Sequence, residues 1–128
     1  MQVTGIDIDP AHLAIAKAQK LMYGLDVSLN EVSLADFESP QPFDAVIASS
    51  VIWHILGWGN LKAALSEEEL TAKIEALVGK FLFWESGPQP EREINLIKNN
   101  TNLKTFQELG TTSATGIEAR TFGVFIRS

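Results

Sequence analysis

The chain has 128 residues, a formal net charge of −6 and no cysteine, and its isoelectric point lies near 4.8. The lack of cysteine excludes disulfides, zinc-thiolate centres and thiol nucleophiles, and the acidic balance argues against a broad surface for nucleic-acid phosphates. No apolar run approaches the roughly 20 residues of a membrane span, and no signal-peptide pattern opens the chain. We therefore expect a soluble, cytoplasmic protein with one domain over residues 1–128.

The first third of the chain predicts a strand, a helix and a second strand. Residues 3–7 form a short β-rich run, and Asp9 followed by Pro10 is typical of a helix N-cap with proline at the first helical position. Gly24 is expected to end this helix, and residues 27–34 form a second apolar strand. The helix should bury one apolar stripe, made of Ala11, Ala14, Ile15, Ala18, Met22 and Leu25.

The middle of the chain predicts a buried strand and a helix with a clear capping signal at its start. Residues 43–49 contain the continuous apolar run Ala45–Ala48, which suits a strand covered on both faces. Ser66 and Glu69 form a capping box, and Gly79 is expected to stop the helix that follows. The core face of that helix is a stripe at helical spacing, made of Leu70, Ile74, Leu77 and Val78.

The last third predicts two further strands and two helical pieces. Residues 80–85 form a buried strand ending at Glu85, and a helix begins near Pro90. Residues 103–109 are expected to be helical before Gly110, and residues 121–127 alternate like a final strand. Strands that alternate with helices indicate an α/β fold with a mostly parallel sheet.

Polar residues follow several of these strands, at the sheet edge where α/β proteins bind ligands. Asp7, Asp36 and the pair Ser49–Ser50 are therefore expected to line one cleft. A carboxylate after an apolar strand, such as Asp7, is typical of a group that binds ribose hydroxyls, although a helix-entry carboxylate has the same pattern. Asp36 could equally cap a turn, and Glu85 is either an acceptor-site carboxylate or a solvated strand end.

In their order these features resemble the class I S-adenosylmethionine-dependent methyltransferases. Four pieces carry the resemblance: Val-Thr-Gly-Ile-Asp-Ile-Asp-Pro with its helix, Ala-Asp-Phe, Phe-Asp-Ala-Val-Ile-Ala-Ser-Ser-Val-Ile-Trp-His, and the strand ending at Glu85. The resemblance implies a Rossmann-like sheet with helices on both faces and S-adenosylmethionine as cofactor. It implies that Asp7, with Ile8 beside it, binds the ribose hydroxyls. It also implies that Asp36, with Phe37 beside it, binds the adenine. It assigns the methionine and acceptor side to the segment that begins with Ser49 and Ser50 and ends at His54.

The sequence departs from the family because its first strand and Gly-x-Gly-x-Gly turn are missing. We therefore expect a sheet that is incomplete at the N-terminus, with residues 3–7 and 43–49 either adjacent and parallel or separated by a gap one strand wide. Finding these two segments antiparallel, or in different sheets, would end the methyltransferase interpretation. A preceding segment or a partner chain is expected to complete the sheet, and the chain alone should be weakly active or inactive.

Methyl transfer depends mainly on positioning, because the sulfonium is already an activated donor. His54 is the candidate general base, although a hydrogen-bonded structural histidine fits the same position, and His12 is expected to be solvated. The segment after residues 43–49 lacks the Asn/Asp-Pro-Pro-aromatic motif of base-amino methyltransferases. This favours a small-molecule or protein acceptor over nucleic acid.

Three other functions fit parts of the pattern. A methyltransferase-like subunit or scaffold without catalysis is suggested by the missing glycine-rich turn. A nicotinamide-binding fragment would share the carboxylate after the second strand. A phosphatase of the haloacid-dehalogenase type would use Asp7 and Asp9, but Pro10 and the absence of a late acidic pair disfavour it.

Overall fold

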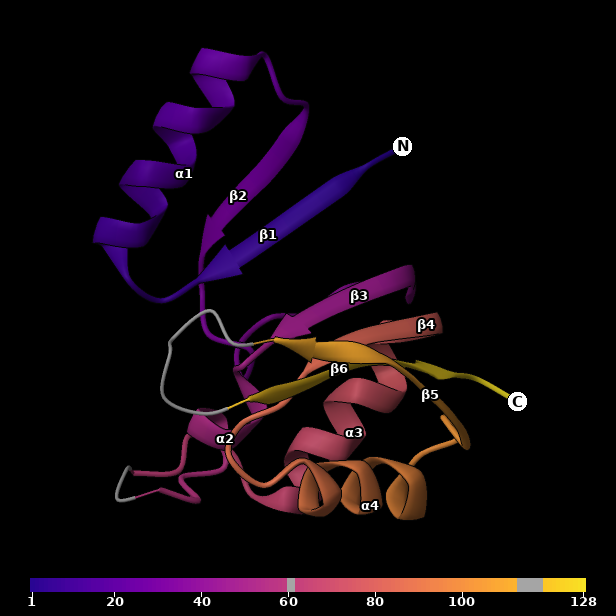
Figure 1. Ribbon diagram of the computed structural model, residues 1–128. Coiled ribbons are helices and arrows are strands. Elements are labelled where there is room, and N and C mark those ends of the chain that lie inside the picture. The colour runs from indigo at the N-terminus through magenta and orange to yellow at the C-terminus, as the bar shows by residue number, and fades with distance from the viewer. Residues whose placement is uncertain (60–61, 113–118) are drawn as a thin grey trace. The chain divides into compact units, whose positions relative to one another are not determined.

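The structure is a computed structural model that describes residues 1–59, 62–112 and 119–128. The chain divides into two compact units, Met1–Glu38 and Ser39–Ser128. Figure 1 shows the elements of both units in chain order.

Unit 1 is a strand, a helix and a parallel strand. β1 (Val3–Asp7) pairs with β2 (Val27–Glu31) in parallel, and α1 (Pro10–Tyr23) connects them. The predicted helix boundaries are confirmed: the Asp9 side chain accepts a hydrogen bond from the Ala11 amide at 2.8 Å, and Gly24 ends α1 in the left-handed conformation at φ 62°. Local capping chemistry therefore sets both ends of α1.

The predicted core stripe of α1 is wrong. Its buried residue is Leu13, which lies outside that stripe, whereas the Ile15 and Met22 side chains are 61% and 73% exposed. A sheet of two strands offers a narrow surface, so it covers only a small part of a helix of this length.

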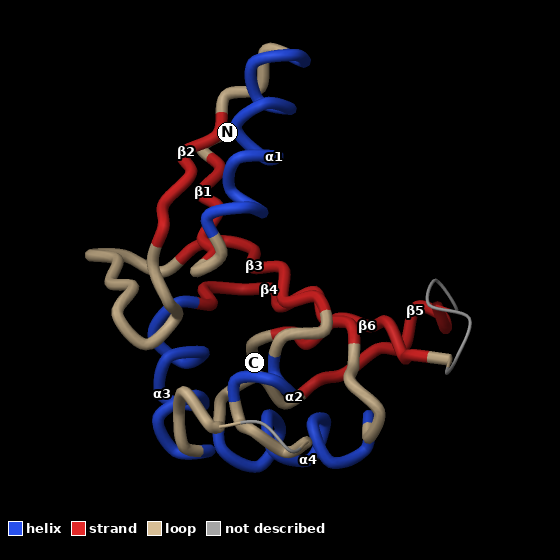
Figure 2. Tube along the Cα trace, turned by 90° about the vertical axis from the view of Figure 1, so that its left-hand side faces the viewer, coloured by secondary structure: helices blue, strands red, loops and turns tan. Residues whose placement is uncertain are grey.

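Unit 2 is a four-stranded sheet in the order β3-β4-β6-β5, with helices along it. β3 (Phe43–Ser49) pairs in parallel with β4 (Val78–Glu85), and β6 (Arg120–Ile126) runs antiparallel to both β4 and β5 (Thr105–Thr112). The short α2 (Ile52–Ile55) follows β3. Figures 1 and 2 show α3 (Glu67–Leu77) and α4 (Pro90–Asn100) on the same side of this sheet.

The core of unit 2 lies between these helices and the sheet. It contains Leu70, Ile74, Leu77, Val78, Leu82, Trp84, Ile97, Leu103 and Phe125, all buried. The predicted stripe of α3 is thereby confirmed for Leu70, Ile74 and Leu77, whereas Val78 is buried as the first residue of β4. The capping box is confirmed as well: the Ser66 hydroxyl accepts a hydrogen bond from the Glu69 amide, and the Glu69 carboxylate accepts one from the Ser66 amide, each at 3.1 Å.

The prediction that Gly79 stops α3 is wrong. The helix ends at Leu77, and Gly79 lies inside β4. A β-carbon added at Gly79 would come within 2.8 Å of the Phe43 carbonyl oxygen. This position therefore needs glycine because the backbone of β3 approaches closely.

The helix predicted over residues 103–109 is also wrong, because this stretch enters β5. Its Phe106 ring packs against Phe125 and Trp84, with centroid separations of 4.8 and 5.7 Å. Phe125 belongs to β6, so β5 owes its conformation to pairing with a segment further along the chain, and tertiary packing overrides the local pattern.

The α/β class is confirmed, but the strands are not mostly parallel: β1–β2 and β3–β4 are parallel pairs, whereas β4–β6 and β5–β6 are antiparallel pairs. The predicted adjacency of residues 3–7 and 43–49 is wrong. Among the described residues β1 pairs with β2 and β3 pairs with β4, and the two pairs belong to different sheets. Two separate sheets are the outcome that was expected to end the methyltransferase interpretation. That criterion was wrong, because a gap one strand wide, which was also expected, leaves the two segments in different sheets as well. The gap itself stays a prediction.

Candidate functional site

Asp7 is the last residue of β1, and its carboxylate is held by two neighbours. One oxygen, Oδ1, accepts a hydrogen bond from the Asp9 amide at 2.8 Å, and Oδ2 lies 3.3 Å from Nδ1 of His12. The amide hydrogen bond, together with the nearby imidazole, holds the pKa of Asp7 below its usual range. The side chain is 39% exposed, so unit 1 presents an ionised carboxylate at the carboxyl end of its first strand.

His12 contacts two carboxylates rather than standing alone in solvent. Its Nε2 lies 3.5 Å from Oδ2 of Asp9, while its Nδ1 faces Asp7. The side chain is still 67% exposed, as the prediction of a solvated histidine requires. The signal for these contacts was the spacing: His12 is three residues after the N-cap Asp9 and lies in the first turn of α1.

Asp36 lies in a turn after β2. The Ser33 hydroxyl donates to its Oδ2 at 3.1 Å and also accepts a hydrogen bond from the Asp36 amide at 3.2 Å. These bonds give Asp36 the turn-capping contacts that the sequence allowed. Because β1 and β2 run parallel, their carboxyl ends lie at the same edge of the sheet (Figure 1). Asp7 ends β1, and the Val32 amide, directly after β2, donates to its carbonyl oxygen at 3.1 Å.

Two of the remaining candidates in unit 1 differ in exposure. The Ile8 side chain is 69% exposed, directly after Asp7. Phe37 is half-buried, and its amide donates to the Ser33 carbonyl oxygen at 2.9 Å. Both residues therefore flank the carboxylates that the sequence singled out, one beside Asp7 and one beside Asp36.

In unit 2 the pair Ser49–Ser50 meets Glu85 at the carboxyl ends of β3 and β4. The Ser49 hydroxyl donates to Glu85 Oε1 at 3.2 Å, and the Ser50 hydroxyl donates to the same oxygen. The Ser50 amide also donates to the Glu85 carbonyl oxygen at 3.0 Å. Ser50 has a φ of 56°, a conformation that is uncommon for residues other than glycine. Glu85 is thus bound to the serines and is not merely a solvated strand end.

His54 lies on α2 with an exposed side chain. Within the described residues its imidazole has no hydrogen-bond partner, and both roles that the sequence allowed for it stay predictions. The neighbouring Trp53 ring makes an edge contact with Trp58 at a centroid distance of 5.9 Å. The Arg92 guanidinium lies 3.7 Å from the centroid of the Trp58 ring.

The described residues contain no group of three or more histidine, cysteine or acidic side chains that could hold a metal ion. Within the same part of the chain, none of the helices has the length and apolar character that crossing a membrane requires. The candidate chemistry therefore rests on two sets of residues: Asp7 and Asp36 with their neighbours in unit 1, and Ser49, Ser50, Glu85 and His54 in unit 2.

Comparisons with known proteins identify relatives. Residues 1–71 match a family model described as a methyltransferase domain, and none of the curated proteins matches the chain. The N-methyltransferase NodS from Bradyrhizobium japonicum WM9, in complex with S-adenosyl-L-homocysteine, has 15% identity and a TM-score of 0.69, covering 98% of this chain and 66% of that one. An rRNA methylase from Streptococcus thermophilus has 11% identity and a TM-score of 0.65, covering 98% and 73%.

The same comparison finds a protein with a different described activity. The [4+2]-cyclase SpnF has 20% identity and a TM-score of 0.57, covering 88% of this chain and 44% of that one. At these identities the solved structures show the fold alone, because one fold can host several kinds of chemistry.

Proposed function

Because this chain belongs to the methyltransferase domain family, we propose that it serves S-adenosylmethionine-dependent methyl transfer to a small-molecule or protein acceptor. The observation that carries the proposal is the ionised Asp7 carboxylate at the carboxyl end of β1, inside the matched residues 1–71. Family membership favours this reaction over the nicotinamide and phosphatase functions that the sequence also allowed.

The residues of unit 1 fit the adenosine part of the cofactor. An ionised carboxylate has about four lone-pair positions, and Asp7 uses one of them for the Asp9 amide and directs another oxygen toward His12. Further positions remain for the two ribose hydroxyls. In this proposal Asp36 accepts a hydrogen bond from the adenine amino group, and Ile8 and Phe37 pack against the rings.

The residues of unit 2 serve the reacting end of the molecules. The cofactor supplies an activated methyl group on a sulfonium, so the protein's task is to hold the acceptor in line with it. Ser49 and Ser50 belong to the methionine and acceptor side in this proposal. His54, with an exposed imidazole, is the group that takes a proton from the acceptor.

The sheets suggest what completes the site. In the described residues β1 and β2 pair only with each other and β3 pairs only with β4, so β1, β2 and β3 each have one edge without a strand partner. Such edges bind further strands readily. We propose that a strand from another segment of the protein, or from a partner chain, pairs there and brings a backbone turn that holds the methionine part of the cofactor. The 128-residue chain then binds the cofactor weakly by itself.

The Asp7→Asn variant tests the ribose assignment. It keeps the shape of the side chain and removes the charge that attracts two hydroxyl donors, so the dissociation constant of S-adenosylhomocysteine is expected to rise roughly tenfold or more. Isothermal titration calorimetry measures it. Asp26→Asn is the matched control, because Asp26 is an exposed aspartate in the same unit. Equal binding by Asp7→Asn and the unchanged chain would remove Asp7 from the site.

The alternative is a methyltransferase-like subunit that does not catalyse methyl transfer. The fold does not decide between the two functions, because it also occurs in a cyclase, a protein whose described chemistry is not methylation. Calorimetry also separates the two functions: a chain that binds no S-adenosylhomocysteine when the open strand edges are filled is a subunit or scaffold, whereas binding that depends on Asp7 supports the enzyme.

A further inference from the structure

We propose that Arg92, Trp53 and Trp58 form a binding site for a carboxylate, and that the methyl acceptor is a small organic acid held through that group. We name these three residues the indole–guanidinium site. The identity of the acceptor rests on the proposed function, whereas the binding of a carboxylate to the site does not. All three residues belong to unit 2, and His54 lies between the two tryptophans in the chain.

The Arg92 guanidinium is supported by an aromatic ring. Its Cζ atom lies 3.7 Å from the centroid of the Trp58 ring. In the part of the chain that the structure describes, this guanidinium donates to no oxygen and forms no ion pair, and the side chain is exposed. A guanidinium that stacks on a ring keeps the N–H groups at its rim for a planar partner with two oxygens, and a carboxylate fits that fork.

The acidic neighbours of Arg92 on α4 do not neutralise it. Glu91 and Glu93 flank it in the sequence, but residues adjacent in a helix do not face each other. The buried Glu93 carboxylate already accepts hydrogen bonds from Trp84 Nε1 at 3.1 Å and from the Gly87 amide at 2.7 Å. The charge of Arg92 is therefore available to an anion from solution, in a chain whose net charge of −6 otherwise repels anions.

The indole of Trp53 adds a second donor to the site. Its ring meets the Trp58 ring at 5.9 Å between centroids, with 85° between the planes. Its Nε1 has no acceptor among the described residues, where every buried side-chain nitrogen has a partner, so this nitrogen is reached by solvent. A β-carbon added at Gly59 would come within 3.0 Å of Nε1, so glycine keeps space beside the donor.

The composition of the site favours a carboxylate over a phosphate. Its three side chains contain N–H donors, two apolar rings, one positive charge and no acceptor oxygen. A phosphate monoester carries about −1.5 to −2 charges at neutral pH, whereas a carboxylate carries one, which a single guanidinium balances. The rings suit the carbon portion of an organic acid. An acid fixed in this way presents the rest of its structure to the segment that contains His54, the proposed base.

The backbone holds the two rings before any ligand binds. The Trp58 amide donates to the Trp53 carbonyl oxygen at 3.3 Å. A β-carbon added at Gly87 would lie 2.6 Å from the Cβ atom of Trp53 and 3.1 Å from Oε2 of Glu93. Trp53 therefore rests on a backbone segment that the buried Glu93 carboxylate fixes from the other side, and the site is preorganised.

The test is a titration of the 128-residue chain with sodium benzoate, followed by the indole N–H signals of its three tryptophans in ¹H–¹⁵N spectra. The signals of Trp53 and Trp58 are expected to shift saturably. Trp84 is an internal reference, because its indole is fully buried and bound to Glu93, and its signal should stay in place. Equal shifts of all three signals would mean a general effect of the added salt and would overturn the proposal.

Two further ligands separate charge and shape. Benzamide has the same ring and no charge, so it should bind about tenfold more weakly or less. Equal binding of benzamide and benzoate would mean that ring contacts alone attract the ligand, and the carboxylate site would be overturned. Stronger binding of inorganic phosphate than of benzoate would overturn it as well.

Variants assign the binding to Arg92. Arg92→Met should raise the dissociation constant of benzoate about tenfold or more. Lys80→Met is the matched control, because Lys80 is an exposed cation of the same unit that lies over another ring, 5.1 Å from the centroid of Phe81, and this change should leave the constant as it is. Arg92→Lys keeps the charge without the planar fork and should weaken binding about threefold. Undiminished binding by Arg92→Met would overturn the site.

The proposed function fails separately from this inference. Asp7→Asn should weaken S-adenosylhomocysteine binding and leave benzoate binding unchanged, and Arg92→Met should do the reverse. If benzoate binds and S-adenosylhomocysteine never does, the carboxylate site stands and the methyltransferase proposal falls. If the cofactor product binds and benzoate does not, the carboxylate site is overturned and the methyltransferase proposal stands. Displacement of benzoate by S-adenosylhomocysteine would assign the site to the cofactor's own carboxylate and overturn the inference about the acceptor.

Discussion

The Glu93→Ala variant is expected to lower the free energy of unfolding by about 3 to 5 kcal/mol. Glu93 lies on α4 with a fully buried side chain, and both of its oxygens have donors: Trp84 Nε1 at 3.1 Å and the Gly87 amide at 2.7 Å. Alanine would leave these two buried donors without an acceptor. Each such donor loses its hydrogen bond and regains no water, which is the costliest way to break a polar contact. Urea unfolding measures the change.

Two further variants define the cause. Glu93→Gln fills the same space but has one acceptor oxygen, so one donor keeps its partner and the loss should be about half as large. Glu91→Ala removes an exposed glutamate from the first turn of the same helix and should change the stability by no more than about 0.5 kcal/mol. A Glu93→Ala protein as stable as Glu91→Ala would show that the buried bonds contribute nothing.

The stability of the folded chain should also depend on pH through Glu93. Burial raises the pKa of Glu93 above its ordinary value of 4.5, against the effect of the two hydrogen bonds. Between that value and the raised pKa the folded state binds the proton that the unfolded state has lost, so stability falls as the pH rises through this window. Glu93→Gln should lack this fall. Subtracting its unfolding free energies from those of the unchanged chain isolates the effect from Asp7 and Glu75, whose lowered pKa values act in the opposite direction.

Local chemistry made much of this fold predictable. The ends of α1 depend on Asp9, Pro10 and Gly24, and the start of α3 depends on Ser66 and Glu69, all of which act within one turn of the chain. Such signals are visible in a sequence because the interacting groups are a few residues apart. The two strands of unit 1 and the final strand were likewise visible as short β-rich runs.

The failures share a different cause, because they depend on contacts between distant segments. Phe106 belongs to a strand because it packs on Phe125, and the sequence around Phe106 does not indicate that partner. Gly79 was assigned to a helix end because glycine is common there, while its actual constraint is the approach of the Phe43 carbonyl oxygen from another strand. Local propensity is a weak guide wherever tertiary packing decides.

The candidate site shows the same division. The rule that ligands bind at strand ends was enough to single out Asp7, Asp36, Ser49 and Ser50 from the sequence. It could not show that the hydroxyls of Ser49 and Ser50 both turn toward Glu85, which is 36 and 35 residues away in the chain. Nor could it show that His12 faces the Asp7 carboxylate. Strand order predicts which residues meet, but the direction of each proton depends on side-chain geometry.

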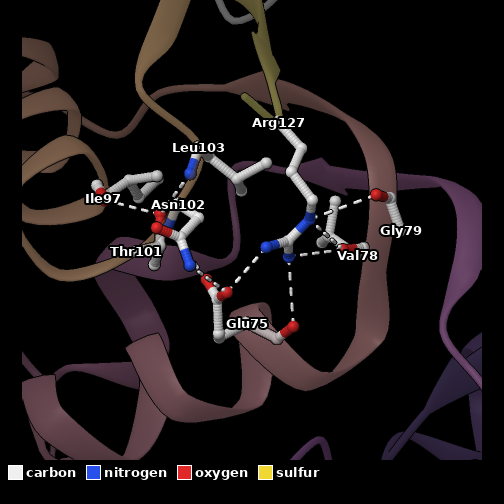
Figure 3. A network of polar contacts seen from close by, with 8 residues as sticks. All are labelled: Glu75, Val78, Gly79, Ile97, Thr101, Asn102, Leu103 and Arg127. Carbon is white, nitrogen blue, oxygen red and sulfur yellow. Dashed lines mark hydrogen bonds and ion pairs between the residues drawn. The ribbon is translucent and has the colours of Figure 1, made fainter.

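Replacing Arg127 should have the second large effect on stability. Figure 3 shows its guanidinium group directed at the end of α3 and the start of β4. It donates to the carbonyl oxygens of Glu75 at 3.1 Å and Val78 at 2.6 Å, and to the Glu75 carboxylate at 2.6 Å, while its Nε also faces the Gly79 carbonyl oxygen at 3.1 Å. The last carbonyl groups of a helix have no partner within the helix and attract positive charge. Arg127 therefore joins the C-terminal strand to this helix end.

The network continues through Glu75 to another segment. Its carboxylate accepts hydrogen bonds from the amide and the side chain of Asn102, at 2.9 and 3.0 Å. The Asn102 amide and the nearby Arg127 hold the pKa of Glu75 below its usual range, so the pair is ionised at neutral pH. The Glu75 side chain thus connects Arg127, which directly follows β6, with Asn102 in the loop after α4.

Arg127→Ala is expected to lower the free energy of unfolding by about 2 to 4 kcal/mol, since several carbonyl groups and one carboxylate lose their charged donor together. Arg127→Lys keeps the charge but lacks the planar fork of donors, so it should recover less than half of that loss. Urea unfolding of both variants at neutral pH measures the difference. If lysine restored the full stability, charge alone would explain the contribution of Arg127, and if alanine cost less than about 0.5 kcal/mol, the network would not stabilise the fold.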